Sequence, residues 1–181
     1  MPHILSIALV LQLHNFAGAP PAIVDKAERE LTRVYDDIGV HVEWDGARDR
    51  HADARGAIRI ILVAHDAGDL RRTPHTVMGA TMWTDHGTPA VYVFYRRVEA
   101  EAERHGVSTA LVLACALAHE VGHVLMPEGG HSREGLMRAF WNGDDFHSAD
   151  RGQLRFIPEQ AALLRHAAIA PRDQTTETQR H

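Results

Sequence analysis

One segment of the sequence constrains the fold more than any other: an uncharged, apolar run that leads directly into an HExxH pattern. Residues 109–118 (TALVLACALA) carry no charge, and HEVGH follows at residues 119–123. Because an α-helix has about 3.6 residues per turn, residues i and i+4 lie one turn apart on the same face. Two imidazoles at this spacing can bind one metal ion while Glu120 lies beside them. The segment therefore predicts a buried helix, residues 109–126, that carries part of a zinc site.

The residues after this helix supply a third candidate ligand. The chain has 14 His among 181 residues, so a bare HExxH match is only moderately specific. His131, however, comes eight residues after His123, beyond Pro127, which ends the helix, and Gly129-Gly130, which permits a sharp turn. Catalytic zinc sites typically have three protein ligands and an open position for water. We therefore predict one catalytic Zn²⁺ ion bound by His119, His123 and His131.

The third ligand is the least constrained of the three. Several carboxylates after the helix compete with His131 for this role: Glu128, Glu134, Asp144, Asp145 and Asp150. We favour His131, because zinc sites favour nitrogen ligands and the two glycines give the chain reach. The remaining His are scattered singly along the sequence, and ordinary surface positions explain them more simply than metal binding does.

The pattern also indicates a reaction. Zinc lowers the pKa of a bound water toward about 7 and polarises a carbonyl group. Glu120 is placed to accept a proton from that water as a general base and to return it to a leaving amine. We therefore expect a zinc-dependent hydrolase, most simply an endopeptidase, with Glu120 as the catalytic residue. The alternatives are a non-catalytic or regulatory zinc-binding protein that keeps this site, and an exopeptidase or other amide hydrolase.

Composition excludes other classes of function. The net charge is −5 and no block of basic residues occurs, so we expect neither nucleic acid nor a membrane surface as a partner. The length suits one domain with a substantial core, which we assign to residues 1–170; residues 171–181 are a polar tail, expected to be disordered. The single cysteine, Cys115, excludes an internal disulfide and is expected to pack as a small hydrophobic residue. The oligomeric state is not indicated.

The rest of the chain alternates between strand and helix patterns. Apolar or β-branched runs predict strands, and apolar residues at helical spacing predict helices. The expected strands are residues 4–14, 40–44, 57–64 and 90–98, and the expected helices are residues 20–39, 109–126 and 158–168. The arginines at the end of the strand 90–98 favour an exposed sheet edge. We expect loops at residues 45–56, 65–89 and 142–150, and at most a helical turn at residues 99–105.

Residues 107–141 resemble the metzincin clan of zinc metallopeptidases. The pattern of that clan is HExxHxxGxxH, followed by a Met in a tight turn beneath the metal. The matching residues of this chain are His119, Glu120, His123, His131 and Met137. The resemblance implies that the three His are ligands, that Glu120 is the base and that Met137 is the Met-turn residue.

The match departs from the clan pattern, and no Tyr follows Met137 at the position where some members of the clan have one. The interval between the second and third His is two residues longer than in the pattern, and Met126 stands where the Gly is expected. The resemblance implies an α+β fold: a small mixed twisted sheet with an antiparallel edge strand, one backing helix, a central active-site helix, a Met-turn and a C-terminal helix. It divides the catalytic domain into an upper lobe, about residues 1–126, and a lower lobe, about residues 127–170.

The resemblance also suggests how substrate binds. Residues 77–80, followed by the strand 90–98, look like the loop and antiparallel edge strand that hold an extended peptide. We therefore expect a peptide or protein substrate along the strand 90–98. The clan resemblance implies a secreted or periplasmic protein. Residues 4–13, however, lack the basic start of a signal peptide, and we expect them to form a buried strand.

Overall fold

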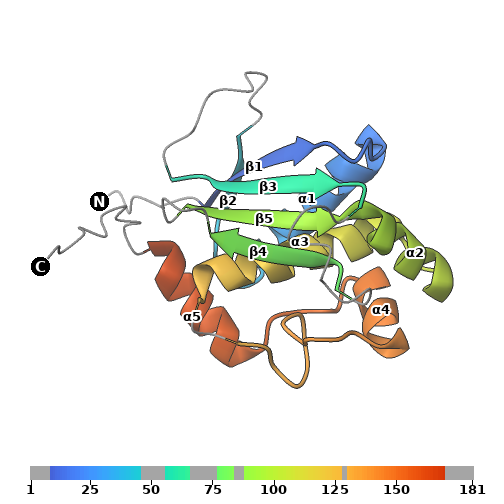
Figure 1. Cartoon of the computed structure of the whole chain (residues 1–181). Helices are drawn as coiled ribbons and strands as arrows, with labels where there is room; N and C mark the ends of the chain where they lie inside the picture. The colour runs from blue at the N-terminus through green and yellow to red at the C-terminus, as the bar shows by residue number, and fades with distance from the viewer. Residues whose placement is uncertain (1–8, 46–55, 66–76, 84–87, 128–129, 170–181) are drawn as a thin grey trace, which may run out of the picture.

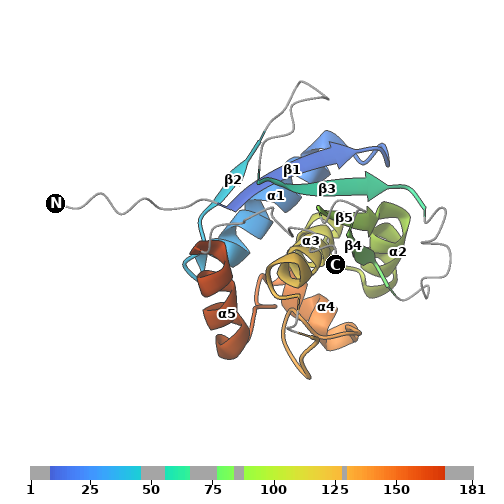
Figure 2. The same ribbon diagram turned by 60° about the vertical axis from the view of Figure 1, so that its left-hand side comes forward.

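The fold is a mixed sheet with helices packed against one of its faces (Figures 1 and 2). The computed structural model describes residues 9–45, 56–65, 77–83, 88–127 and 130–169. This architecture confirms the α+β class expected from the sequence. Parts of several predicted segments lie outside the described residues: the start of the first strand, most of the loops 45–56 and 65–89, and the tail 171–181.

The sheet has the strand order β2-β1-β3-β5-β4. Its strands are β1 (Leu9–Asn15), β2 (Val42–Trp44), β3 (Ile58–Val63), β4 (Gly79–Trp83) and β5 (Pro89–Phe94). The first three and β5 run parallel, whereas β4 pairs antiparallel with β5 and forms one edge. The predicted strand 57–64 is thus confirmed as β3, the central strand of the sheet.

The edge strand is not the one predicted. Residues 90–98 were expected to form it, but β5 ends at Phe94 and lies between β3 and β4. Val91, Val93 and Phe94 are fully buried, so the strand is apolar on both faces and suits the interior of the sheet. The true edge, β4, lies within the region 65–89 that was expected to be a loop. The arginines belong to the following helix, where Arg96 pairs with Glu99 at 2.7 Å.

Five helices are described: α1 (Pro21–Asp36), α2 (Tyr95–His105), α3 (Thr109–Leu125), α4 (Gly143–Asp150) and α5 (Pro158–Ile169). The predictions of α1, α3 and α5 are confirmed, but α2 and α4 replace an expected turn and an expected loop. Helix α4 begins at a capping box, in which the side chains of Asn142 and Asp145 each accept a hydrogen bond from the other's backbone N–H. Within the described residues no helix is both long and apolar enough to cross a membrane.

The core lies between the sheet and helices α1 and α3. Alternate residues of the parallel strands face the helices, and Leu11, Ile60 and Val91 are each fully buried there. Burial of a side chain of this size stabilises the fold by about 1.5–3 kcal/mol. The hydroxyl of Tyr35 on α1 donates to the backbone carbonyl of Ala118 on α3 at 3.1 Å in this core. Helix α3 also lies against β4 and β5 (Figure 1).

Candidate metal centre

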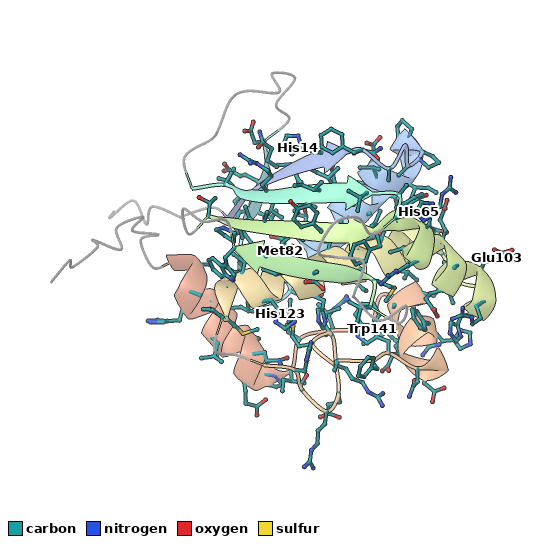
Figure 3. All side chains as sticks on the ribbon, viewed as in Figure 1. His14, His65, Met82, Glu103, His123 and Trp141 are labelled. Carbon is teal, nitrogen blue, oxygen red and sulfur yellow. The ribbon has the colours of Figure 1, made fainter. Side chains whose placement is uncertain are left out.

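Helix α3 places two of the predicted ligands side by side. The helix is buried along most of its length, but His119 and His123 are only partly buried, because both lie on the stripe that faces away from the core. Their Nε2 atoms lie 3.1 Å apart. Figure 3 shows His123 beneath the edge strand, on the same side of the molecule as Trp141. The i, i+4 spacing in the sequence therefore brings the two imidazoles together on one face of the helix, as expected.

The third predicted ligand joins them. The Nε2 atom of the exposed His131 lies 3.2 Å from that of His123. The candidate ligand atoms of all three His lie within 4.8 Å of one another. Two nitrogens that share a tetrahedral ion at about 2.0–2.1 Å are separated by about 3.4 Å, close to the 3.1 and 3.2 Å found here. The three imidazoles are close enough to bind one metal ion.

A short segment, residues 130–142, brings His131 to the helix, and we call it the turn segment. Its tight turn begins at Gly135, whose φ is 74°, and closes with a hydrogen bond from the N–H of Arg138 to the Gly135 carbonyl at 3.1 Å. A Cβ at Gly135 would lie 2.6 Å from the carbonyl oxygen of Arg155, so only glycine fits. The N–H of Ser132 donates to the carbonyl of Met137 at 2.9 Å, which fixes the approach of the preceding His.

Met137 lies directly against helix α3. It is fully buried, and a Cβ on Gly122 would lie 2.7 Å from its sulfur atom. Gly122 is one residue before His123, so the close approach of Met137 requires a residue without a side chain at that point. A Met in a tight turn is therefore packed against helix α3, next to the position of His123. Gly130 has no positive φ, and Gly129 lies outside the described residues, so the sharp turn in this segment is at Gly135.

The turn segment also orients the first ligand. The ring nitrogen Nδ1 of His119 lies 2.8 Å from the carbonyl oxygen of Leu136. A carbonyl can only accept, so Nδ1 carries the proton and Nε2 keeps its lone pair for a metal. The indole N–H of Trp141 donates to the same carbonyl at 3.3 Å. The Leu136 carbonyl oxygen thus accepts hydrogen bonds from both a candidate ligand, His119, and a side chain that lines the cavity, Trp141.

The pKa values of the two helical His favour the neutral, metal-binding form. Burial lowers the pKa of His119 to about 4; the Leu136 carbonyl acts in the opposite direction, and the charges of His123 and His131 lower it further. The pKa of His123 is lowered, first by burial and then by His131. Both imidazoles are therefore neutral near pH 7, with lone pairs available to a cation.

Glu120 lies beside the three His without belonging to the ligand cluster. Its side chain is 7% exposed, and burial raises its pKa to about 7. A hydrogen bond from the hydroxyl of Thr81 to Oε2, at 3.0 Å, acts in the opposite direction on that pKa. A cation held by the His would also favour the ionised form. This carboxyl group is suited to accept and release a proton at neutral pH.

These groups line one cavity of about 540 Å³. Its walls are β4 with the two residues before it, helix α3 and the turn segment. Two of its aromatic side chains are unusually exposed, Trp83 at 52% and Phe140 at 61%. The charge of Arg138, which also lines the cavity, is compensated by Asp145 at 2.8 Å. The cavity therefore offers an apolar surface beside a group of imidazoles and one carboxyl group.

The structure separates the competing ligands from the site. Asp145 accepts bonds from Arg138 and from the N-terminus of α4, and Asp150 accepts one from the N–H of Ser108 at 2.7 Å. Glu134 and Asp144 are exposed and belong to no ligand cluster among the described residues. Glu128 lies outside the described residues.

Sequence reasoning missed the supporting residues of the site. Thr81 and Gly79 lie in the region expected to be a loop, and Leu136 acts through its backbone, which carries no sequence signal. The alternate positions Gly79, Thr81 and Trp83 were the one indication of a strand in this region. A pattern over five residues is too short to be specific.

Comparison with known proteins adds nothing to this description: no protein-family model matches the chain, and no curated protein has significant sequence similarity to it.

Proposed function

We propose that the protein is a zinc-dependent peptidase in which His119, His123 and His131 hold the ion and Glu120 is the general base. The observation that carries this proposal is the convergence of three imidazole nitrogens beside a buried carboxyl group in an open cavity. An all-nitrogen set of three donors is typical of zinc and leaves a coordination position open. The hydrogen bond from His119 to a backbone carbonyl is the outer support that such ligands usually have.

The proposed reaction is hydrolysis of a peptide bond. When bound, zinc supplies a Lewis acid that polarises the substrate carbonyl and lowers the pKa of water. Glu120 takes a proton from the attacking water, whose oxygen forms a bond to the carbonyl carbon. The carbon–nitrogen bond then breaks, and Glu120 returns the proton to the departing amine nitrogen.

The edge strand β4 supports an extended peptide as the substrate. Among the described residues β4 pairs only with β5, so its other side has N–H and C=O groups that a peptide can pair with. The cavity begins directly at this strand, because Gly79, Thr81 and Trp83 line it. Trp83 and Phe140 favour a substrate with a large apolar side chain next to the scissile bond.

A place in the metzincin clan is part of this proposal. The Met beneath the helix, the antiparallel edge strand and the third His support it. The missing Gly of the clan pattern has a local explanation, because Met126 leaves the helix at a φ of −126°, which any residue adopts. The two additional residues before His131 do not prevent it from meeting the helical pair.

Zinc analysis combined with a peptide-library digest tests the proposal. The purified protein should contain about one zinc ion per chain and cleave quenched peptides. A chelator should abolish cleavage and added zinc should restore it. Glu120→Gln should keep the zinc and lose about 100- to 10,000-fold in kcat, the usual contribution of a general base.

Glu103→Gln is the matched control, because Glu103 projects into solvent from α2 at the far end of the molecule (Figure 3). It should cleave like the wild type. Full turnover by Glu120→Gln would refute the assigned base. Bound zinc without cleavage of any library peptide would favour a non-catalytic zinc-binding protein, and cleavage only at free chain ends would favour an exopeptidase.

A further inference from the structure

The edge strand contacts the candidate base directly. The hydroxyl oxygen of Thr81 lies 3.0 Å from Oε2 of Glu120 and 2.9 Å from the backbone carbonyl oxygen of the same residue. A threonine hydroxyl has one proton to donate, and an ionised carboxylate is the stronger acceptor of the two. Among the described residues no other protein group donates to either carboxylate oxygen. Among those residues, the Thr81 hydroxyl is therefore the one hydrogen-bond donor that fixes the orientation of this carboxylate.

The residue two positions earlier closes the other side of the carboxylate. A Cβ on Gly79 would lie 2.7 Å from Cγ and 2.9 Å from Oε1 of Glu120. Residues two apart on a strand point to the same face, so Gly79 and Thr81 both face helix α3. The absence of a side chain at Gly79 leaves the space that the Glu120 side chain occupies, and Thr81 holds its other oxygen.

We propose that Thr81, with the space left by Gly79, is a positioning residue that holds Oε2 of Glu120 and keeps Oε1 available for proton transfer. This inference rests on the proposed function of Glu120 as a general base. It makes the edge strand part of the catalytic arrangement, because the strand that would pair with a peptide also fixes the base. A peptide that orders β4 would at the same time order the carboxylate that acts on it.

Kinetics of the zinc-loaded enzyme provide the first test. Thr81→Val keeps the shape of the side chain and removes the hydroxyl, and we expect kcat to fall about 10- to 100-fold, as is usual for groups that orient site residues. KM and zinc content should not change. Thr81→Ser restores the hydroxyl and should recover most of the lost kcat.

The matched control is Thr32→Val, because Thr32 is also a partly buried threonine whose hydroxyl donates to a backbone carbonyl, that of Glu28 at 2.9 Å, away from the cavity. It should leave kcat unchanged. An unchanged kcat in Thr81→Val, or a loss that Thr81→Ser does not recover, would overturn the proposal. Loss of zinc from Thr81→Val, or a rise in KM as large as the fall in kcat, would also overturn the proposal. Thr81 would then support the fold of the site and not the orientation of Glu120.

A second test needs no activity. In the metal-free protein, the unfolding midpoint of Thr81→Val is compared with and without Glu120→Ala. If Thr81 holds the carboxylate, its substitution should lower the midpoint more when Glu120 is present than when it is absent. Equal shifts would mean that Thr81 serves only the helix backbone, which overturns the proposal. If the zinc-loaded wild type is inactive, the proposed function fails, and this cycle still decides whether Thr81 holds Glu120.

Gly79→Ala tests the proposed close fit by adding a methyl group to the space that the Glu120 side chain occupies. The added methyl group must displace the Glu120 side chain or the backbone carbonyl of Tyr92, which would lie 2.9 Å away. We expect a lower kcat with zinc retained. Gly143→Ala is its control, since a Cβ there meets nothing closer than 3.7 Å. Wild-type kcat in Gly79→Ala would contradict the proposed close fit.

Discussion

The candidate metal centre has two walls of different construction. On helix α3, His119 and His123 belong to a segment that is buried over most of its length and tied together by helical hydrogen bonds. In the turn segment, His131 is exposed and depends on one tight turn and a single bridge between Ser132 and Arg138. The two helical His are positioned by the backbone of a buried helix, whereas His131 is positioned by a few hydrogen bonds within the turn segment.

Because the two walls differ in this way, substitutions in them should differ in their effects on stability and on metal binding. Changes at His119 should affect both, because its partly buried ring is hydrogen-bonded to the carbonyl of Leu136. Changes at His131 should affect metal binding alone, because little covers that side chain. The connection between the walls is the Leu136 carbonyl together with Met137, and it is there that the two properties should become coupled.

Removal of a ligand from each wall should have the largest effect. His119→Ala and His131→Ala should each lower zinc affinity by more than the roughly 10- to 100-fold that loss of an outer partner costs. Only His119→Ala should also destabilise the metal-free protein, by about 1–3 kcal/mol, because a partly buried hydrogen bond to Leu136 is lost. Zinc competition titrations and urea unfolding measure the two effects. Equal losses of stability in both variants would contradict the proposed difference between the walls.

Weakening the connection between the walls should have the next largest effect. Met137→Ala removes a fully buried side chain that packs on Gly122, and we expect a loss of about 2–5 kcal/mol in the free energy of unfolding. Met137→Leu conserves the volume and should cost less than about 1.5 kcal/mol. Met82→Ala, at a residue that is 37% exposed, serves as the control in urea unfolding. A small effect of Met137→Ala would mean that the turn segment is held in another way.

The aromatic side chains of the cavity should have a smaller effect, on substrate binding. Trp83→Ala on the edge strand and Phe140→Ala on the turn segment should each raise KM about 2- to 12-fold for peptides with large apolar residues, equivalent to about 0.5–1.5 kcal/mol. Neither should change zinc content. Leu163→Ala is the matched control, because Leu163 is a similarly exposed apolar residue, at 54%, on α5. Steady-state kinetics measure the change in KM. A rise in KM for Leu163→Ala as large as that for Trp83→Ala and Phe140→Ala would contradict the assignment of the two aromatic residues to substrate binding.

The smallest expected effect is a pH dependence of stability that comes from Cys115 on helix α3. Burial raises the pKa of its thiol to about 12 from an ordinary 9.0, with a smaller opposing effect of Arg155. At pH values between 9.0 and about 12, the thiol is deprotonated in the unfolded chain but still protonated in the native protein. The contribution of this thiol to the free energy of unfolding therefore falls as pH rises above about 9. Urea unfolding at pH 8 and pH 10 should show this fall in the wild type and a shallower one in Cys115→Ala.

The same thiol reports how rigidly the helix wall is packed. In the native protein at pH 8 it should not react with a disulfide reagent, because it is buried and protonated. Rapid reaction without unfolding would show that helix α3 opens, and would remove the contrast with the turn segment.

Several elements were predictable because their signals are local. The end of α3 before Pro127 follows from backbone chemistry that acts within a few residues. The edge of the sheet was not predictable in this way. Strand β4 has five residues and a mixed burial pattern, and its pairing with β5 forms only in the folded protein. Helix α4 was missed because its capping box lies in an acidic sequence that also suits a loop.

The sequence alone determined which atoms are available to a metal: two imidazoles one helical turn apart, a carboxyl group beside them and a third imidazole beyond the helix. It determined these because side-chain spacing on a helix is fixed by the backbone itself. Only the tertiary structure decided that His131 returns to the helix, that Leu136 orients His119 and that Thr81 holds Glu120. Those contacts join segments distant in the sequence, and such contacts exist only once the sheet, helix and turn segment have packed together.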